Sequence, residues 1–274
     1  MPGDAVQDAT GPGDAVRDAA GPGDAVRRGW AFARHRAVLL RRSPGPVLVY
    51  PVMAVALTVF VEPLMHLVPE PHPPGPPHPP GLRAAAGMVV FCTLLMTGVV
   101  GSALVDERGW HTAERLATTP ARPLERLVGG ALPLLGVLLC QQAAVLATAA
   151  LLLPGSPAWA AWPAWPGLVG AGLAWSVCVL GLGSLLGAAT ARPGQLAAVK
   201  DLIALTVAGT GGAIVPPAAL PTWVRPVTGW SPASWAVRAC LGGPGTGGRE
   251  LLLVGTGAAA FVLAAAVLPR RGPA

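Results

Sequence analysis

Few residues of this 274-residue chain could carry chemistry, and many of them lie in one polar segment. The segment, DERGWHTAERLATTPARP, runs from Asp106 to Pro123 between two long apolar stretches. It is charged and helix-forming, so it could be a helix with a functional role between the two apolar stretches. The same composition is also typical of a loop that is only solvated, and both interpretations stay open.

The other polar residues do not form the groupings that catalysis requires. The chain has no G-x-x-x-x-G-K-[ST] motif, and its single lysine, Lys200, follows GQLAAV instead of a phosphate-binding loop. No histidine follows His111, so a serine such as Ser184 has no evident general base. We therefore expect no catalytic residue, metal or cofactor in this chain, and no ATP hydrolysis by the chain alone. The cysteines are far apart and have no metal-ligand spacing: Cys92, Cys140, Cys178 and Cys240.

The elements around the polar segment belong in a membrane. The composition is 53% hydrophobic and 12% charged with a mean hydropathy of +0.56, whereas soluble proteins carry about 25% charged residues. Continuous apolar runs without two-residue alternation indicate helices and not a barrel. The sequence therefore predicts an all-α membrane protein with a bundle of six transmembrane helices. They are expected at about 45–65, 84–105, 127–153, 168–190, 196–215 and 251–268.

The expected domain is a single transmembrane unit, residues 27–274. It follows a tail, residues 1–26, in which a PGDAV motif recurs every ten residues. Such a short polar repeat cannot bury a core, so we expect the tail to be disordered. The basic residues are dispersed at segment ends, which favours topology over nucleic-acid binding as their purpose.

Orientation follows from the basic residues, because short cytoplasmic loops retain Arg and Lys during insertion. With the N-terminus inside, most of them fall on the inner side. Both termini and the segment from Asp106 to Pro123 are then cytoplasmic. Tryptophans after the fifth span suit anchors at the outer interface: Trp223, Trp230 and Trp235. We further expect a local ion pair between Lys200 and Asp201, and close helix packing at Gly183 and Gly187 in GLGSLLG.

The stretch RRGWAFARHRAVLLRRSPGP, which begins at Arg27, predicts an interfacial helix before the first span. Apolar and basic residues alternate there at roughly helical spacing, which suits a helix in the inner headgroup layer. An ordinary basic flank of the first span is nearly as compatible. The residues assigned to the interfacial helix are Arg28, Trp30, Arg34, Arg36 and Arg41.

Together these features resemble the ABC-2 type export permeases. In that family a motif of the form E-R-x-x-G-T-x-E-R-L-x-x-T-P recurs in the first cytoplasmic loop. The matching residues here are Glu107, Arg108, Thr112, Glu114, Arg115, Leu116, Thr119 and Pro120. His111 stands where the family has glycine, so the local turn is in doubt. The stretch VPPAALPTWVRPVTGWSPASWAVRAC resembles the family's external helical or re-entrant segment between spans five and six, here with Pro221, Trp223, Pro232, Trp235 and Arg238.

The resemblance implies a bacterial plasma-membrane subunit that pairs with a separate ATPase, which binds ATP and magnesium, and with a second copy or a homologous permease. The inner loop would be the coupling helix, with contacts from Glu107, Arg108, His111, Thr112, Glu114, Arg115 and Leu116. Scarce polarity in the spans favours a hydrophobic or amphipathic cargo, such as a drug, an antibiotic or a lipid-like molecule. A polytopic membrane enzyme would require His, Asp or Cys residues clustered at one depth of the bilayer, and the sequence has no such cluster. A non-transporting assembly or immunity protein of this architecture remains an alternative.

Overall fold

The computed structural model describes residues 22–42, 44–66, 82–109, 121–152, 165–215, 217, 220–242 and 245–268. In these ranges all regular secondary structure is helical. The helices are α2 (Pro22–Arg42), α3 (Gly45–His66), α4 (Leu82–Leu95), α5 (Thr97–Gly109), α7 (Pro123–Leu152), α8 (Trp165–Ala189), α9 (Pro193–Gly211), α10 (Arg225–Thr228), α11 (Pro232–Leu241) and α12 (Thr246–Val267).

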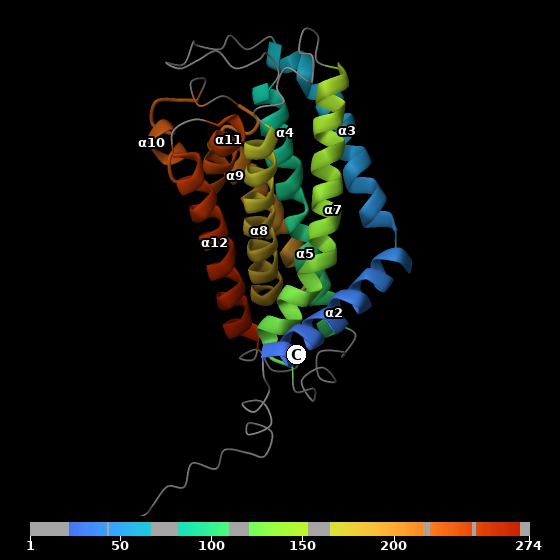
Figure 1. Cartoon of the computed structure of the whole chain (residues 1–274). Coiled ribbons are helices and arrows are strands. Elements are labelled where there is room, and N and C mark those ends of the chain that lie inside the picture. The colour runs from blue at the N-terminus through green and yellow to red at the C-terminus, as the bar shows by residue number, and fades with distance from the viewer. Residues whose placement is uncertain are drawn as a thin grey trace, which may run out of the picture.

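The long helices lie side by side and run along one axis of the bundle (Figure 1). Helix α2 crosses one end of this bundle, beside the start of α7 and the last turns of α12. The short helices α10 and α11 lie at the opposite end, where α11 packs between α4, α8, α9 and α12. The predicted interfacial helix and the predicted external segment are thus at opposite ends of the fold.

A helix lies in each of the six ranges in which spans were predicted, although α9 ends at Gly211 and residues 212–215 of the fifth range are not helical. In the described part of the chain, four stretches are long and apolar enough to cross a membrane: Leu82–Gly109, Pro123–Leu151, Pro166–Ala189 and Thr246–Val267. Helix α3 contributes a shorter apolar stretch, Leu48–Val61. Helix α9 is not among the four, and it carries the charged pair Lys200 and Asp201. An all-helical membrane protein is therefore confirmed, whereas six crossings remain a prediction.

The N-terminal boundary differs from the prediction. Helix α2 begins at Pro22, so residues 22–26 are helical and do not belong to a disordered tail. Proline suits the first position of a helix, because a backbone N–H at that position would have no intrahelical partner and nothing is lost when it is absent. Asp24 in the first turn adds a favourable charge at the helix N-terminus. The rest of the predicted tail, residues 1–21, lies outside the described residues.

Small residues set the distances between the central helices. A Cβ on Gly187 would lie 2.6 Å from the carbonyl oxygen of Gly101, and one on Gly183 would lie 2.7 Å from Cβ of Val100. These contacts join α8 to α5 and confirm the packing predicted for the two glycines. On the other side of α8, a Cβ on Gly257 of α12 would lie 2.6 Å from a carbonyl oxygen of α8. At these glycines the backbones of α5 and of α12 each approach the backbone of α8 so closely that a side chain would collide.

The second predicted span is interrupted at Met96, between α4 and α5. The N–H of Met96 donates to the carbonyl of Thr93 at 3.1 Å, which is a tighter turn than an α-helix. Thr93 also donates its hydroxyl to the carbonyl four residues earlier, a contact that often bends helices. Met96 is fully buried, so the tighter turn lies inside the bundle.

Candidate functional site: a charge cluster where the polar segment begins

Six charged residues gather at the end of the bundle that α2 crosses, where the polar segment from Asp106 starts and ends. We call them the basal charge cluster: Arg28 and Arg36 of α2, Glu107 and Arg108 of α5, and Glu125 and Arg126 of α7. Five of the predicted coupling residues lie outside the described residues: His111, Thr112, Glu114, Arg115 and Leu116. The structure therefore shows what holds this segment at both ends, and not the segment itself.

The shortest ion pair in the cluster joins α2 to the first turn of α7. Arg28 donates from Nε to Oε2 of Glu125 at 2.8 Å and from Nη2 to Oε1 at 3.0 Å. Two parallel bonds of this kind fix orientation as well as distance. The hydrogen bond to Glu125 raises the pKa of Arg28, partly offset by burial. Oε2 of Glu125 also accepts the backbone N–H of Arg122 at 3.2 Å, which caps the start of α7.

A glycine pair lies beside this ion pair. A Cβ on Gly129 of α7 would lie 2.3 Å from the carbonyl oxygen of Gly29 of α2. The two helices therefore cross backbone against backbone, one turn from the contact between Arg28 and Glu125. A side chain at position 129 would collide with the backbone of α2, so this glycine permits the close crossing.

Glu107 connects three helices. Its Oε1 lies 3.9 Å from Nη1 of Arg36, and its Oε2 lies 3.7 Å from Nη2 of Arg126. Burial lowers the pKa of Arg36, and the nearby Glu107 opposes that shift. A carboxylate shared by two arginines helps keep α2, α5 and α7 together at the beginning of the polar segment.

Arg108 points into the fold. Its guanidinium donates to the carbonyls of Gly187, Ala188 and Thr190, and the Thr190 contact measures 2.9 Å. These carbonyls belong to the last turn of α8 and the residue after it, where a helix leaves its C=O groups without partners. A cation at this end is also favoured by the helix dipole. The prediction gave Arg108 to the ATPase contact, which stays untested, and the structure adds a bond from the polar segment to α8.

The predicted interfacial helix is helical throughout, as expected. Arg28 and Arg36 point toward α7 and α5, where they form the ion pairs described above. Trp30, Arg34 and Arg41 are exposed. The basic residues of α2 therefore fall into two groups. Arg28 and Arg36 form ion pairs with α7 and α5, whereas Arg34 and Arg41 are exposed.

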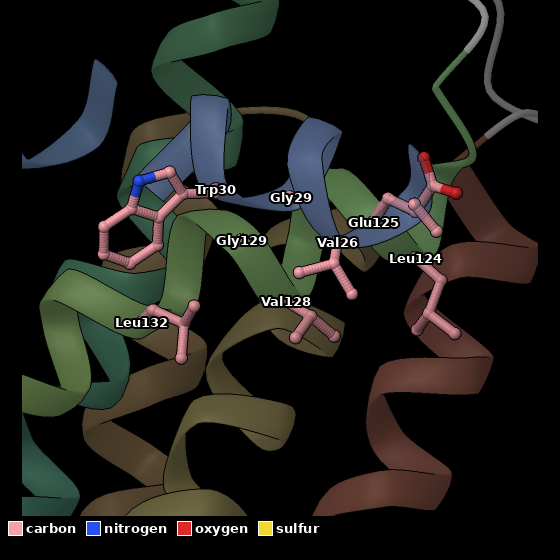
Figure 2. Close-up of a pocket in the computed structure, with 9 residues that line it drawn as sticks. Val26, Gly29, Trp30, Leu124, Glu125, Val128, Gly129 and Leu132 are labelled. Carbon is pink, nitrogen blue, oxygen red and sulfur yellow. The ribbon is translucent and has the colours of Figure 1, made fainter. Parts of the chain in front are cut away.

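An open apolar groove lies between α2 and α7 where the two helices cross, and its volume is about 420 Å³. Figure 2 shows Val26 and Trp30 of α2 on one side and Leu124, Val128 and Leu132 of α7 on the other. Gly29 and Gly129 lie between the two rows, and Glu125 stands at one end.

The residues predicted for the external segment lie at the opposite end of the bundle (Figure 1). The carbonyl of Pro221 accepts two backbone N–H groups in the turn before α10, and Pro232 is the first residue of α11. Trp235 donates from Nε1 to the carbonyl of Gly229 at 2.7 Å. Trp223 and Trp230 are exposed, which is compatible with the predicted anchoring of tryptophans at a membrane interface. Arg238 is exposed as well.

Sequence reasoning missed two buried amides in the middle of α7. Gln142 donates from Nε2 to Thr93 Oγ1 at 3.1 Å, to Ser176 Oγ at 2.9 Å and to the carbonyl of Gly172 at 3.2 Å. Its neighbour Gln141 is also buried, and neither of its amide atoms has a hydrogen-bond partner among the described residues. The signal was the pair QQ within the apolar run LLCQQAAVL.

The ion pair predicted between Lys200 and Asp201 is confirmed, with Nζ and Oδ1 2.6 Å apart. The carbon stem of Lys200 lies against α5, because a Cβ on Gly98 would come within 2.3 Å of it. Three of the four cysteines are buried as small apolar residues, as expected, and Cys140 is exposed.

The described part of the chain is all-helical and contains four helices long and apolar enough to cross a membrane, as expected of a multi-pass membrane protein. The family model for the ABC-2 type transporter matches residues 47–243, which is most of the chain. The chain therefore belongs to the ABC-2 type transporter family and is a transmembrane permease component, distinct from the ATPase of such a transporter. No curated protein matches the chain significantly.

Proposed function

We propose that this chain is the permease subunit of an exporter that is driven by a separate ATP-binding cassette ATPase. Two permease subunits, identical or homologous, line the path, and ATP-driven closure of the two ATPase subunits switches that path from inward-facing to outward-facing. The observation that carries the proposal is the basal charge cluster. It ties both ends of one polar segment to three helices of the bundle.

The proposed coupling residues are Glu107, Arg108, His111, Thr112, Glu114, Arg115 and Leu116. A short segment transmits force only if its ends are firmly joined to the helices that must move. Arg108 supplies such a joint to α8 through three carbonyl contacts. Glu107 supplies another to α2 and α7. A push on the segment would then reach α8 directly and α2 through ion pairs.

Both termini and the polar segment are proposed to be cytoplasmic in a bacterial plasma membrane, with six crossings that include α3 and α9. The basic residues of α2 and of the basal charge cluster favour this orientation, because positive charge is retained inside. The cargo is proposed to be hydrophobic or amphipathic. The described spans carry few charges, and the amide of Gln142 is bonded within the bundle.

The test is efflux from proteoliposomes that contain the chain and its partner ATPase. Glu114→Lys should abolish ATP-dependent efflux while membrane insertion is preserved. Arg108→Gln should reduce efflux at least tenfold and uncouple cargo from ATP hydrolysis, because α8 loses its bond to the segment. Arg42→Gln is the matched control, since Arg42 is exposed and has no ion pair with a described residue.

Unchanged efflux in both variants would contradict the coupling role. Cargo movement without any ATPase, or labelling of a cysteine at Thr112 only from outside the cell, would contradict the export mechanism and its orientation. If the chain copurifies with an ATPase whose activity no cargo stimulates, a non-transporting assembly protein becomes the better interpretation.

A further inference from the structure

The groove between α2 and α7 is open and lined by two rows of apolar side chains. Its walls are Val26, Trp30, Leu124, Val128 and Leu132, whose exposed fractions range from 41% to 72% (Figure 2). The floor is the contact of Gly29 with Gly129, which leaves no side chain between the two walls. The only polar residue among the lining residues, Glu125, is bonded to Arg28.

The groove continues into an exposed stripe along α7. Residues on one face of a helix recur every three or four positions. Beyond Leu132, the exposed residues of α7 follow that spacing up the helix: Gly136, Cys140, Ala143, Ala147 and Leu151. This stripe is apolar along its whole length, so an acyl chain that lies against it can continue into the groove without meeting a polar group.

A row of arginines flanks the groove on α2. Arg27, Arg34 and Arg41 recur every seven residues, which places them on one side of the helix. Arg27 and Arg34 are within one turn of the groove residues Val26 and Trp30, whereas Arg41 lies about three turns further along α2. All three are exposed, and none forms an ion pair with the part of the chain that the structure describes. Arg27 and Arg34 therefore lie on the helix side that adjoins the groove residues Val26 and Trp30, and no carboxylate among the described residues pairs with either of them.

We propose that this groove is a binding site for an anionic phospholipid, a role beyond that of coupling to an ATPase. One acyl chain lies between Val26, Val128 and Leu132 and continues along α7. The phosphate lies beside Arg27 and Arg34, because a basic helix flank attracts anionic headgroups. A second copy of the chain is a poorer occupant, since a symmetric contact at this face would bring two arginine rows together.

The experiment uses the purified full-length chain without any ATPase, delipidated in detergent and titrated with dioleoyl phosphatidylglycerol or dioleoyl phosphatidylcholine. Native mass spectrometry counts the bound lipids. We expect preference for phosphatidylglycerol, and a loss of affinity of about fivefold for each of Arg27→Gln and Arg34→Gln. Arg42→Gln, which removes an equal charge on the far side of α2, should keep wild-type affinity.

A second arm tests the groove itself. Val128→Trp should fill it and lower the affinity for both lipids, whereas glycerol 1-phosphate, a headgroup without acyl chains, should not bind measurably. Thermal unfolding without added lipid verifies that each variant is folded. Equal affinity for the two lipids, equal losses in Arg42→Gln, or a dimer in place of bound lipid would overturn the proposal. Because no ATPase is present, none of these results depends on the export mechanism.

Discussion

The neighbouring glutamines of α7 should respond in opposite directions to the same substitution. Gln142→Leu removes an amide whose two N–H hydrogens are shared among three acceptors on α4 and α8. Hydrogen bonds between helices in membranes contribute about 0.6 kcal/mol each. The loss should therefore be about 1 to 2 kcal/mol, because leucine has a similar volume and the threonine and serine keep their own backbone bonds.

Gln141→Leu should stabilise the protein. This side chain is 1% exposed, and its amide has no partner among the described residues. A buried polar group without a hydrogen bond costs about 1 to 3 kcal/mol. Leucine removes that cost and preserves packing along the stripe of Leu134, Leu138 and Val145. The two variants should differ by about 3 kcal/mol in the free energy of unfolding.

The assay is reversible unfolding in mixed micelles of dodecyl maltoside and dodecyl sulfate. Tryptophan fluorescence is a suitable signal, because Trp175 lies in the fully buried core and donates to the carbonyl of Val90. If Gln141→Leu destabilises the protein as much as Gln142→Leu does, the reasoning is refuted. That result would show that the amide of Gln141 is hydrogen-bonded in the folded protein.

Three other substitutions test the contacts between helices. Gly129→Val should release α2 from α7 and destabilise the protein by about 1 to 3 kcal/mol, whereas Gly130→Val, whose Cβ meets nothing within 4 Å, should cost much less; chemical unfolding measures both. Glu125→Gln should speed hydrogen exchange of the backbone amides in α2 but not in the central helices, because the two hydrogen bonds from Arg28 to the carboxylate are lost. Unchanged exchange would show that the contact of Gly29 with Gly129 alone holds α2. Gly257→Val should lower the thermal unfolding temperature through collision with α8, and its control Gly255→Val, which faces open space, should leave that temperature nearly unchanged.

The predicted helices depended on local information, which explains why most of them are present. About 20 consecutive apolar residues specify a membrane-length helix wherever they occur, because backbone groups in hydrocarbon must bond within the segment. The stop at SPGP is local in the same sense: α2 ends at Arg42 and α3 begins at Gly45. The packing of Gly183 and Gly187 was also predictable, since a small residue every fourth position leaves one helix face flat.

The tighter turn at Met96 and the start of α2 were harder to predict. A hydropathy pattern does not register where a helix tightens, because Met96 is as apolar as its neighbours. Thr93, whose hydroxyl bonds the backbone, and Gly98 are the local signs of this turn. At the N-terminus, Pro22 and Asp24 together favour a helix start. They were not recognised as such a signal because they belong to the third copy of the ten-residue repeat, which was assigned to a disordered tail.

The amino-acid sequence alone determined that this chain is helical, lies in a membrane and has one charged segment between its second and third predicted spans. Only the tertiary structure decided what the charges contact. Arg28 and Glu125 are 97 residues apart, and Arg108 reaches carbonyls about 80 residues away. Hydropathy is a property of consecutive residues, whereas an ion pair forms between whichever side chains the packed helices bring within a few ångströms.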